Sequence, residues 1–77
     1  MLVQVKAAGH LFHRMPDGQR EMQVNMTQGE TVLDLLAHLG LHKRQVWIIH
    51  LNGENVDAEQ SLADGDSVVL YPLIGGG

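Results

Sequence analysis

The sequence of 77 residues contains no cysteine. Without cysteine the chain has no disulfide framework, no thiolate nucleophile and no sulfur ligand for a metal ion. Secreted domains of this size usually depend on disulfides for stability, so the absence of cysteine favours an intracellular, cytoplasmic location.

Positive charge is also scarce. The five Lys and Arg residues are spread along the chain, and the formal net charge is -4. Proteins that bind nucleic acids present clustered basic residues on one face, so we expect no nucleic-acid partner.

Long hydrophobic runs are missing as well. The first residues, MLVQVKAAGH, include no basic region followed by a long apolar stretch, so we expect neither a signal peptide nor a membrane span. Hydrophobic residues make up 44% and charged residues 18%, which is typical of a globular protein. A chain this short forms one domain and buries only about 60% of its unfolded surface, so its core is small.

The first half of the chain begins with two alternating segments. Residues 2–7 alternate from Val3 onward and predict a strand, with Val3, Val5 and Ala7 facing inward. The triplet Pro16-Asp17-Gly18 predicts a turn, and residues 22–26 then alternate again. We expect the two segments to form an antiparallel hairpin with a long loop.

A short helix is predicted next. Thr31 is a candidate N-cap, with Asp34 as the acidic member of a capping-box-like pair. Gly40 is expected to end the helix in a left-handed conformation, so that Leu41 folds back against Leu36. One apolar stripe follows the helical spacing: Val32, Leu35, Leu36 and Leu39.

The second half of the chain predicts three more strands. The segment QVWIIHL, residues 45–51, is rich in β-branched and aromatic residues, and Asn52-Gly53 after it is a strong hairpin signal that leads to a brief strand around Val56. Residues 57–62 predict an irregular or 3₁₀ connection, and a turn at residues 64–66 leads to a last strand, residues 67–71, which Pro72 is expected to end.

The predicted order is β-β-α-β-β-β. A single main helix must then cover one face of a mixed sheet, which is an α+β roll of the ubiquitin-like β-grasp class. We expect this domain to span residues 1–72 and a flexible glycine tail to span residues 73–77.

Three segments of the sequence, GETVLDLLAHLGL, LNGENV and LADGDSVVLYPLIGGG, resemble the MoaD/ThiS family of ubiquitin-like sulfur carriers, and the resemblance covers essentially the whole chain. Its most specific element is a DGD turn followed by one apolar strand and a terminal glycine pair. Gly76 and Gly77 correspond to that pair, and Gly75 is an additional glycine.

The resemblance implies a chemistry for the tail. An E1-like adenylating enzyme would use ATP to activate the Gly77 carboxylate, and sulfur from a desulfurase or sulfurtransferase would displace AMP and leave a thiocarboxylate. Gly75 and Gly76 would pass through the narrow channel of that enzyme, because glycine adopts backbone conformations closed to other residues. Leu73 and Ile74 would form an apolar anchor outside the channel. The chain itself would bind no cofactor.

A docking face is predicted beside the tail. If Val68 and Leu70 on the last strand point into the core, Val69 and Tyr71 point outward. We likewise expect Trp47, Ile49 and Leu51 on the third strand to point inward, so Ile48 and His50 point outward. An exposed apolar patch beside a reactive tail suggests a partner interface. Its expected members are Ile48, His50, Val69 and Tyr71, joined by Phe12 from the first loop.

Five histidines raise the possibility of a metal site. His38 and His42 have the spacing of two ligands on one helix face, but Gly40 between them is expected to end the helix. Asp64 and Asp66 flank a turn glycine, where aspartate is common for backbone reasons. There is no Ser-His-Asp set, phosphate loop or dinucleotide fingerprint, so we expect no metal site and no catalytic activity in the chain itself.

Three functions stay open at this point. The hairpins and the DGD segment resemble carriers for molybdopterin or tungstopterin synthesis, in which a larger synthase subunit accepts the sulfur. The triple glycine and the preceding Ile74 also fit a carrier for the thiazole of thiamine. A ubiquitin-like modifier, joined through Gly77 to lysines of other proteins, would be activated in the same way.

Overall fold

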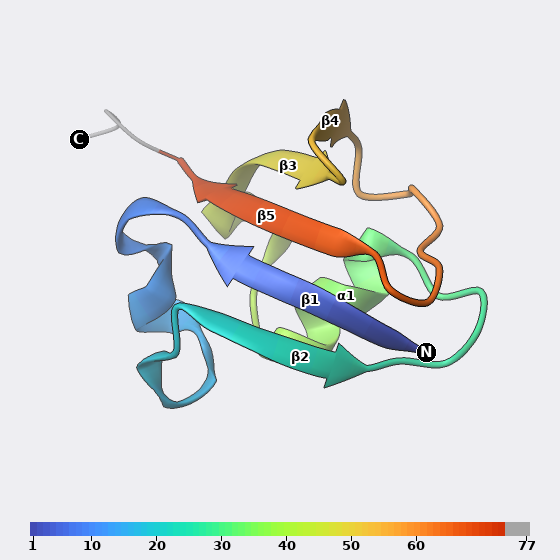
Figure 1. Ribbon diagram of the computed structural model, residues 1–77. Coiled ribbons are helices and arrows are strands. Elements are labelled where there is room, and N and C mark those ends of the chain that lie inside the picture. Colours follow the sequence, from blue (N-terminus) through green and yellow to red (C-terminus); the bar gives the residue numbers. More distant parts are fainter. Residues whose placement is uncertain (74–77) are drawn as a thin grey trace.

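The computed structural model describes residues 1–73. Five strands form one mixed sheet in the order β2-β1-β5-β3-β4, and α1 lies across one side of it (Figure 1). The elements in chain order are β1 (Leu2–Ala7), η1 (Gly9–Arg14), η2 (Pro16–Gly18), β2 (Glu21–Asn25), α1 (Val32–Leu39), η3 (Lys43–Gln45), β3 (Val46–Leu51), β4 (Glu54–Val56) and β5 (Ser67–Pro72), where η denotes a 3₁₀ helix.

The strand pairing confirms the predicted ubiquitin-like β-grasp class. The first hairpin, β1 with β2, is antiparallel, and β5 returns to lie parallel to β1 in the middle of the sheet. β3 pairs antiparallel with both β5 and β4. Within residues 1–73 there is one α-helix, and no helix there is long and apolar enough to cross a membrane.

The ends of α1 are formed by the residues that the sequence indicates. The Asp34 side chain accepts a hydrogen bond of 2.8 Å from the Thr31 amide, and the Thr31 hydroxyl accepts one of 3.4 Å from the Asp34 amide, which completes a capping box. At the other end Gly40 has a φ of 73°. The Leu41 amide then donates to the Leu36 carbonyl at 2.9 Å, as in a Schellman ending. Both caps confirm the prediction.

The core lies between α1 and the inner face of the sheet. The apolar stripe of α1 is buried throughout, and the inner residues of the two central strands are 0–2% exposed. Each fully buried Val or Leu contributes about 1.5–3 kcal/mol. The residues that carry this contact are Val3, Val5 and Ala7 of β1, Val68 and Leu70 of β5, and Val32, Leu35, Leu36 and Leu39 of α1.

In the second half of the chain, the turn after β3 agrees with the sequence prediction, whereas the end of β5 differs from it by one residue. Asn52 and Gly53 have φ values of 51° and 87°, the positive pair that a type I′ hairpin turn needs, so the predicted hairpin is confirmed. The last strand is one residue longer than expected, because Pro72 pairs with Val46 at the end of β5. Proline is tolerated there since it lies at the end of the ladder, where its missing amide donor costs little.

Candidate partner interface

The last strand, β5, presents hydrophobic side chains on both of its faces. Val68 and Leu70 are buried in the core, whereas Val69 and Tyr71 are half-buried on the face of the sheet opposite to them. This opposite side is called the open face below. Because side chains alternate along a strand, two of the residues predicted to dock a partner lie there.

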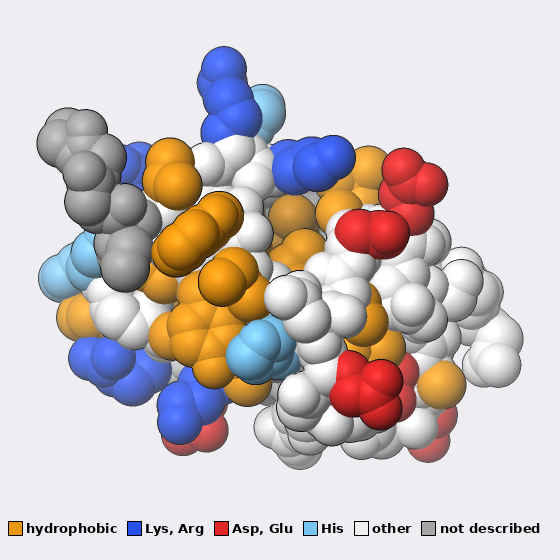
Figure 2. All heavy atoms as spheres, turned by 90° about the horizontal axis from the view of Figure 1, so that it is seen from above, with side chains coloured by type: hydrophobic (Ala, Val, Ile, Leu, Met, Phe, Trp, Pro, Cys, Tyr) orange, Lys and Arg blue, Asp and Glu red, His pale blue; other side chains and the backbone are white. Residues whose placement is uncertain are grey.

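β3 brings the other two predicted residues next to them. Ile48 pairs with Tyr71, and His50 pairs with Val69. The rings of His50 and Tyr71 meet edge to face, with centroids 4.9 Å apart. The four side chains therefore form one cluster on β3 and β5. In the left half of Figure 2, hydrophobic side chains gather in this way beside a histidine.

Trp47 corrects the sequence prediction. It was expected to face the core, but its side chain is 58% exposed. The register between β3 and β5 shifts between Val46 and Ile48, so β3 carries one extra residue there. Such a bulge breaks the strict alternation of side chains, and Val46 packs against the core in place of the tryptophan.

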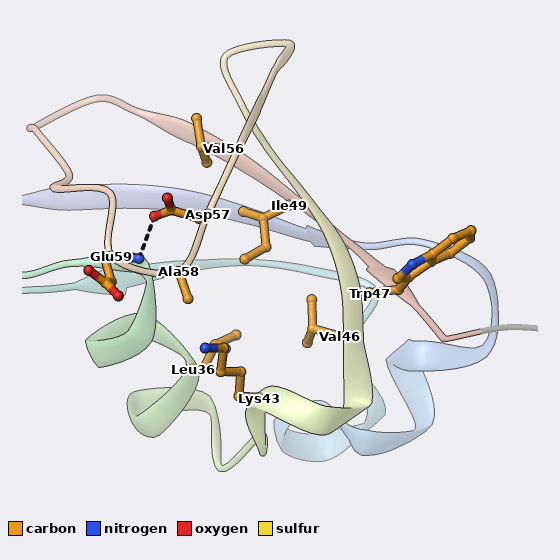
Figure 3. A pocket seen from close by; sticks show the side chains of 9 residues that line it. All are labelled: Leu36, Lys43, Val46, Trp47, Ile49, Val56, Asp57, Ala58 and Glu59. Atoms are coloured by element: carbon orange, nitrogen blue, oxygen red, sulfur yellow. Dashed lines mark hydrogen bonds between the residues drawn. The ribbon is translucent and has the colours of Figure 1, made fainter.

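The bulge enlarges the cluster on the open face. Trp47 lines a shallow hollow of about 340 Å³ together with Ile48, Tyr71, Pro72, Ala8 and Gly9. Figure 3 views β3 near a second hollow between α1, β3 and β4, and Trp47 points away from the other labelled side chains there. Ile48 and Tyr71 in the wall of the first hollow were predicted to face outward, and the exposed Trp47 is the member that sequence reasoning missed. We call the set Trp47, Ile48, His50, Val69 and Tyr71 the docking face.

The contacts of Phe12 are with residues outside the docking face. Its ring packs at 4.0 Å from the His13 ring, and the Arg20 guanidinium lies over it at 4.1 Å. It is partly buried against the core, and the hollow on the open face is lined by other residues. A role for Phe12 in binding a partner stays a prediction.

The start of the tail lies at one end of the docking face. Leu73 is 55% exposed. It lines a small hollow of about 180 Å³ with Pro72, Leu11, His10, Arg14 and Gln45. The remaining predicted tail residues, Ile74, Gly75, Gly76 and Gly77, lie outside the described residues.

The histidines make local contacts. His38 lies 3.3 Å from Glu30, and the His42 ring accepts a hydrogen bond from the Arg44 amide at the start of η3. Gly40 separates the two, since the helix ends there. Residues 1–73 contain no group of three or more potential metal ligands.

The family model that describes the ThiS family matches residues 11–77. The chain belongs to the ThiS family. A search of curated protein sequences finds no significant match. Family membership agrees with the resemblance read from the sequence and with the β-grasp fold.

Solved structures of small proteins and subunits have the same fold as this ThiS family member. The putative subunit 1 of a molybdopterin converting factor from Pyrococcus furiosus is 23% identical, with a TM-score of 0.75, and the match covers 96% of this chain and 99% of that one. Small archaeal modifier protein 1 from Haloferax volcanii is 21% identical, with a TM-score of 0.77 and coverages of 95% and 98%.

A third similar structure is a complex. In the complex of subunits 1 and 2 of the molybdopterin-converting factor from Helicobacter pylori, the matched chain is 25% identical, with a TM-score of 0.66 and full coverage of both chains. The names of these proteins include a subunit of a converting factor and a protein modifier. The fold is therefore shared by subunits of molybdopterin converting factors and by a protein modifier, and the likeness does not single out one pathway.

Proposed function

We propose that the chain is a sulfur carrier that accepts sulfur on the carboxylate of Gly77. The observation that supports this most is the match to the ThiS family, which extends through the glycines to residue 77. The docking face supports it as well, because it continues along β5 to Leu73, where the tail begins.

In the proposed reaction the Gly77 carboxylate attacks the α-phosphate of ATP within an E1-like adenylating enzyme, and pyrophosphate leaves. The outer sulfur of a persulfide on a desulfurase or sulfurtransferase then attacks the acyl carbon and displaces AMP. A thiol reductant cleaves the resulting acyl disulfide, becomes oxidised to a disulfide itself and leaves the thiocarboxylate. Activation is required because a free carboxylate is a poor electrophile. The chain is the substrate of these steps and supplies the carbonyl carbon; the catalytic groups belong to its partners.

The proposed sulfur acceptor is a synthase subunit that makes molybdopterin or tungstopterin. The likeness to subunit 1 of molybdopterin-converting factors favours this assignment over the thiazole of thiamine. Attachment to lysines of other proteins is the second candidate, and the likeness to a small archaeal modifier protein favours it.

Mass spectrometry of the intact protein tests the proposal. The full chain is incubated with ATP, cysteine, a cysteine desulfurase, a thiol reductant and the adenylating enzyme isolated from source cells by affinity to the immobilised chain. A carrier gains the mass difference of one sulfur for one oxygen, and the chain that lacks Gly77 gains nothing while keeping its melting temperature. A chain that forms only conjugates with other proteins is a modifier, and one that never reacts with ATP contradicts both assignments.

A further inference from the structure

The charges of this protein are separated in space. All five Lys and Arg residues lie on β1, on the connection from β1 to β2, or on η3. Eight of the nine carboxylates lie elsewhere: Glu21, Glu30, Asp34, Glu54, Asp57, Glu59, Asp64 and Asp66. Figure 2 shows blue side chains mainly in the left half of the view and red ones mainly on the right. The net charge of -4 therefore conceals a cationic end.

Among residues 1–73 no Lys or Arg of this end forms a salt bridge with a carboxylate. The one contact within residues 1–73 that meets the distance of a salt bridge joins His38 and Glu30, which lie away from Lys6, Arg14 and Arg20 in the sequence. Lys6, Arg14 and Arg20 are exposed. Glu21 lies opposite Lys6 in the β1–β2 ladder and offsets part of its charge, whereas the charges of Arg14 and Arg20 have no carboxylate opposite them in the sheet formed by the described residues.

These three side chains lie beside the docking face or beside the start of the tail. Arg14 lines the hollow at Leu73, at the start of the tail. Lys6 is paired with Val69 across the β1–β5 ladder, so it lies on the open face beside the cluster.

Arg20 is held in place beside the same surface. Its guanidinium lies 4.1 Å from the centre of the Phe12 ring and donates a hydrogen bond of 3.4 Å to the Gly9 carbonyl. Gly9 in turn lines the hollow with Trp47 and Tyr71. A cation over an aromatic face is stabilised and loses freedom, so this charge is positioned before a partner arrives.

We propose that Lys6, Arg14 and Arg20 form a cationic rim that guides the docking face onto an acidic protein surface around the mouth of the activating enzyme's tail channel. The inference rests on the proposed function and adds the charge of the partner to it. The hydrophobic surface between the cations favours a protein over a polyphosphate chain, because phosphates would leave the ring of Trp47 and the half-buried Tyr71 uncovered.

The rim acts mainly on the rate of encounter. Exposed charges at the edge of an interface change the association rate and its dependence on salt, whereas the buried centre determines the dissociation rate. Complementary fields raise association rates by about 10- to 1,000-fold, and salt screens them as the Debye length falls from about 8 Å at 0.15 M to about 3 Å at 1 M.

The experiment measures association and dissociation rates of the full chain with the isolated adenylating enzyme, from about 0.05 M to 1 M NaCl. The double variant Arg14→Gln/Arg20→Gln is expected to associate about three- to tenfold more slowly at low salt. Its dissociation rate should stay close to that of the wild type, and the two association rates should converge at about 1 M NaCl as the charges are screened. A second double variant, Lys6→Gln/Arg14→Gln, should show the same slower association at low salt, and it leaves the Arg20–Phe12 contact intact.

A matched control changes the net charge equally at the other end. Gln28→Glu/Gln60→Glu lowers the charge by the same two units on exposed loop positions, and it should associate nearly as fast as the wild type. Equal slowing of the control and the rim variants would overturn the rim, because net charge alone would explain it. The rim would also be overturned if the association rate of the wild type did not fall with rising salt. RNA binding that the rim variants lose would overturn it too, because the partner would then be a nucleic acid.

The outcome for sulfur loading separates the two proposals. A chain that gains its thiocarboxylate but shows no salt-dependent association contradicts the rim and leaves the carrier function standing. A chain that never reacts with ATP contradicts the carrier function itself.

Discussion

β1 and β5 lie side by side in the middle of the sheet, run parallel and bury equally hydrophobic inner faces. Their outer faces differ. β1 places Leu2, Gln4 and Lys6 on the open face, all exposed and with Leu2 at the start of the strand, whereas β5 places Val69 and Tyr71 there, both half-buried. A strand with one face on the core and one face in solvent needs only one hydrophobic face, and beyond Leu2 the outer face of β1 is polar. The second hydrophobic face of β5 lies on the strand that leads into the tail, and this is where the proposed partner is expected to bind.

The largest effect on folding is expected from the inner face of β5. Leu70 is 0% exposed and lies among the side chains that meet α1. Leu70→Ala should lower the free energy of unfolding by about 2–5 kcal/mol, because it leaves a cavity in a small core. Denaturant unfolding measures this loss. A midpoint equal to that of the wild type would show that the two faces of β5 are not divided between fold and partner.

The next largest effect is expected from the outer face of the same strand. Tyr71→Glu should weaken binding to the adenylating enzyme by about 2 kcal/mol or more, because the complex would bury an unpaired charge in place of an aromatic anchor. Calorimetric titration measures the affinity, and a melting curve should stay close to that of the wild type. Wild-type affinity would place the docking face elsewhere, and a collapsed melting curve would make Tyr71 a core residue.

A variant at Trp47 tests whether this side chain is exposed by the bulge in β3 or buried as simple alternation along the strand predicts. As an exposed residue it should contribute to docking, so Trp47→Ala should weaken binding by about 1–2 kcal/mol and change stability little. A tryptophan buried in the core would instead cost about 3–5 kcal/mol of stability on truncation. Unfolding and binding measured on the same variant decide between the two positions. Ile49→Ala, the truncation of a buried neighbour on β3, should show the opposite result.

The parts of the fold that depend on local chemistry could be predicted from the sequence. The capping box of Thr31 and Asp34, the left-handed Gly40 and the turn at Asn52-Gly53 each depend on a few neighbouring residues. The alternation of β1 and β5 likewise determines which side chains reach the core. The class of the fold followed from these elements because one helix has to cover the sheet.

The features that could not be predicted depend on residues far apart in the sequence. Four consecutive apolar residues, VWII, fit either phase of a strand, and the bulge at Trp47 is set by the pairing of Val46 with Pro72, 26 positions away. The cationic end is similar. Lys6, Arg14 and Arg20 are scattered in the sequence, and they lie beside one surface only after β1, η1 and the start of β2 fold around the end of β5.

The smallest effect is expected on the open face of β1. Gln4 is exposed and pairs with Ser67 at the end of β5 that is remote from Leu73. Gln4→Ala removes no buried contact and no charge, so it should change stability by less than about 0.5 kcal/mol. Its affinity for the adenylating enzyme should equal that of the wild type within error, and the same titration and melting curve used for Tyr71→Glu measure both. A loss of affinity comparable to that of Tyr71→Glu would mean that the partner covers β1 as well as β5. The polar side chains of β1 would then belong to the interface, and the difference between the two strands would reflect two parts of one binding surface.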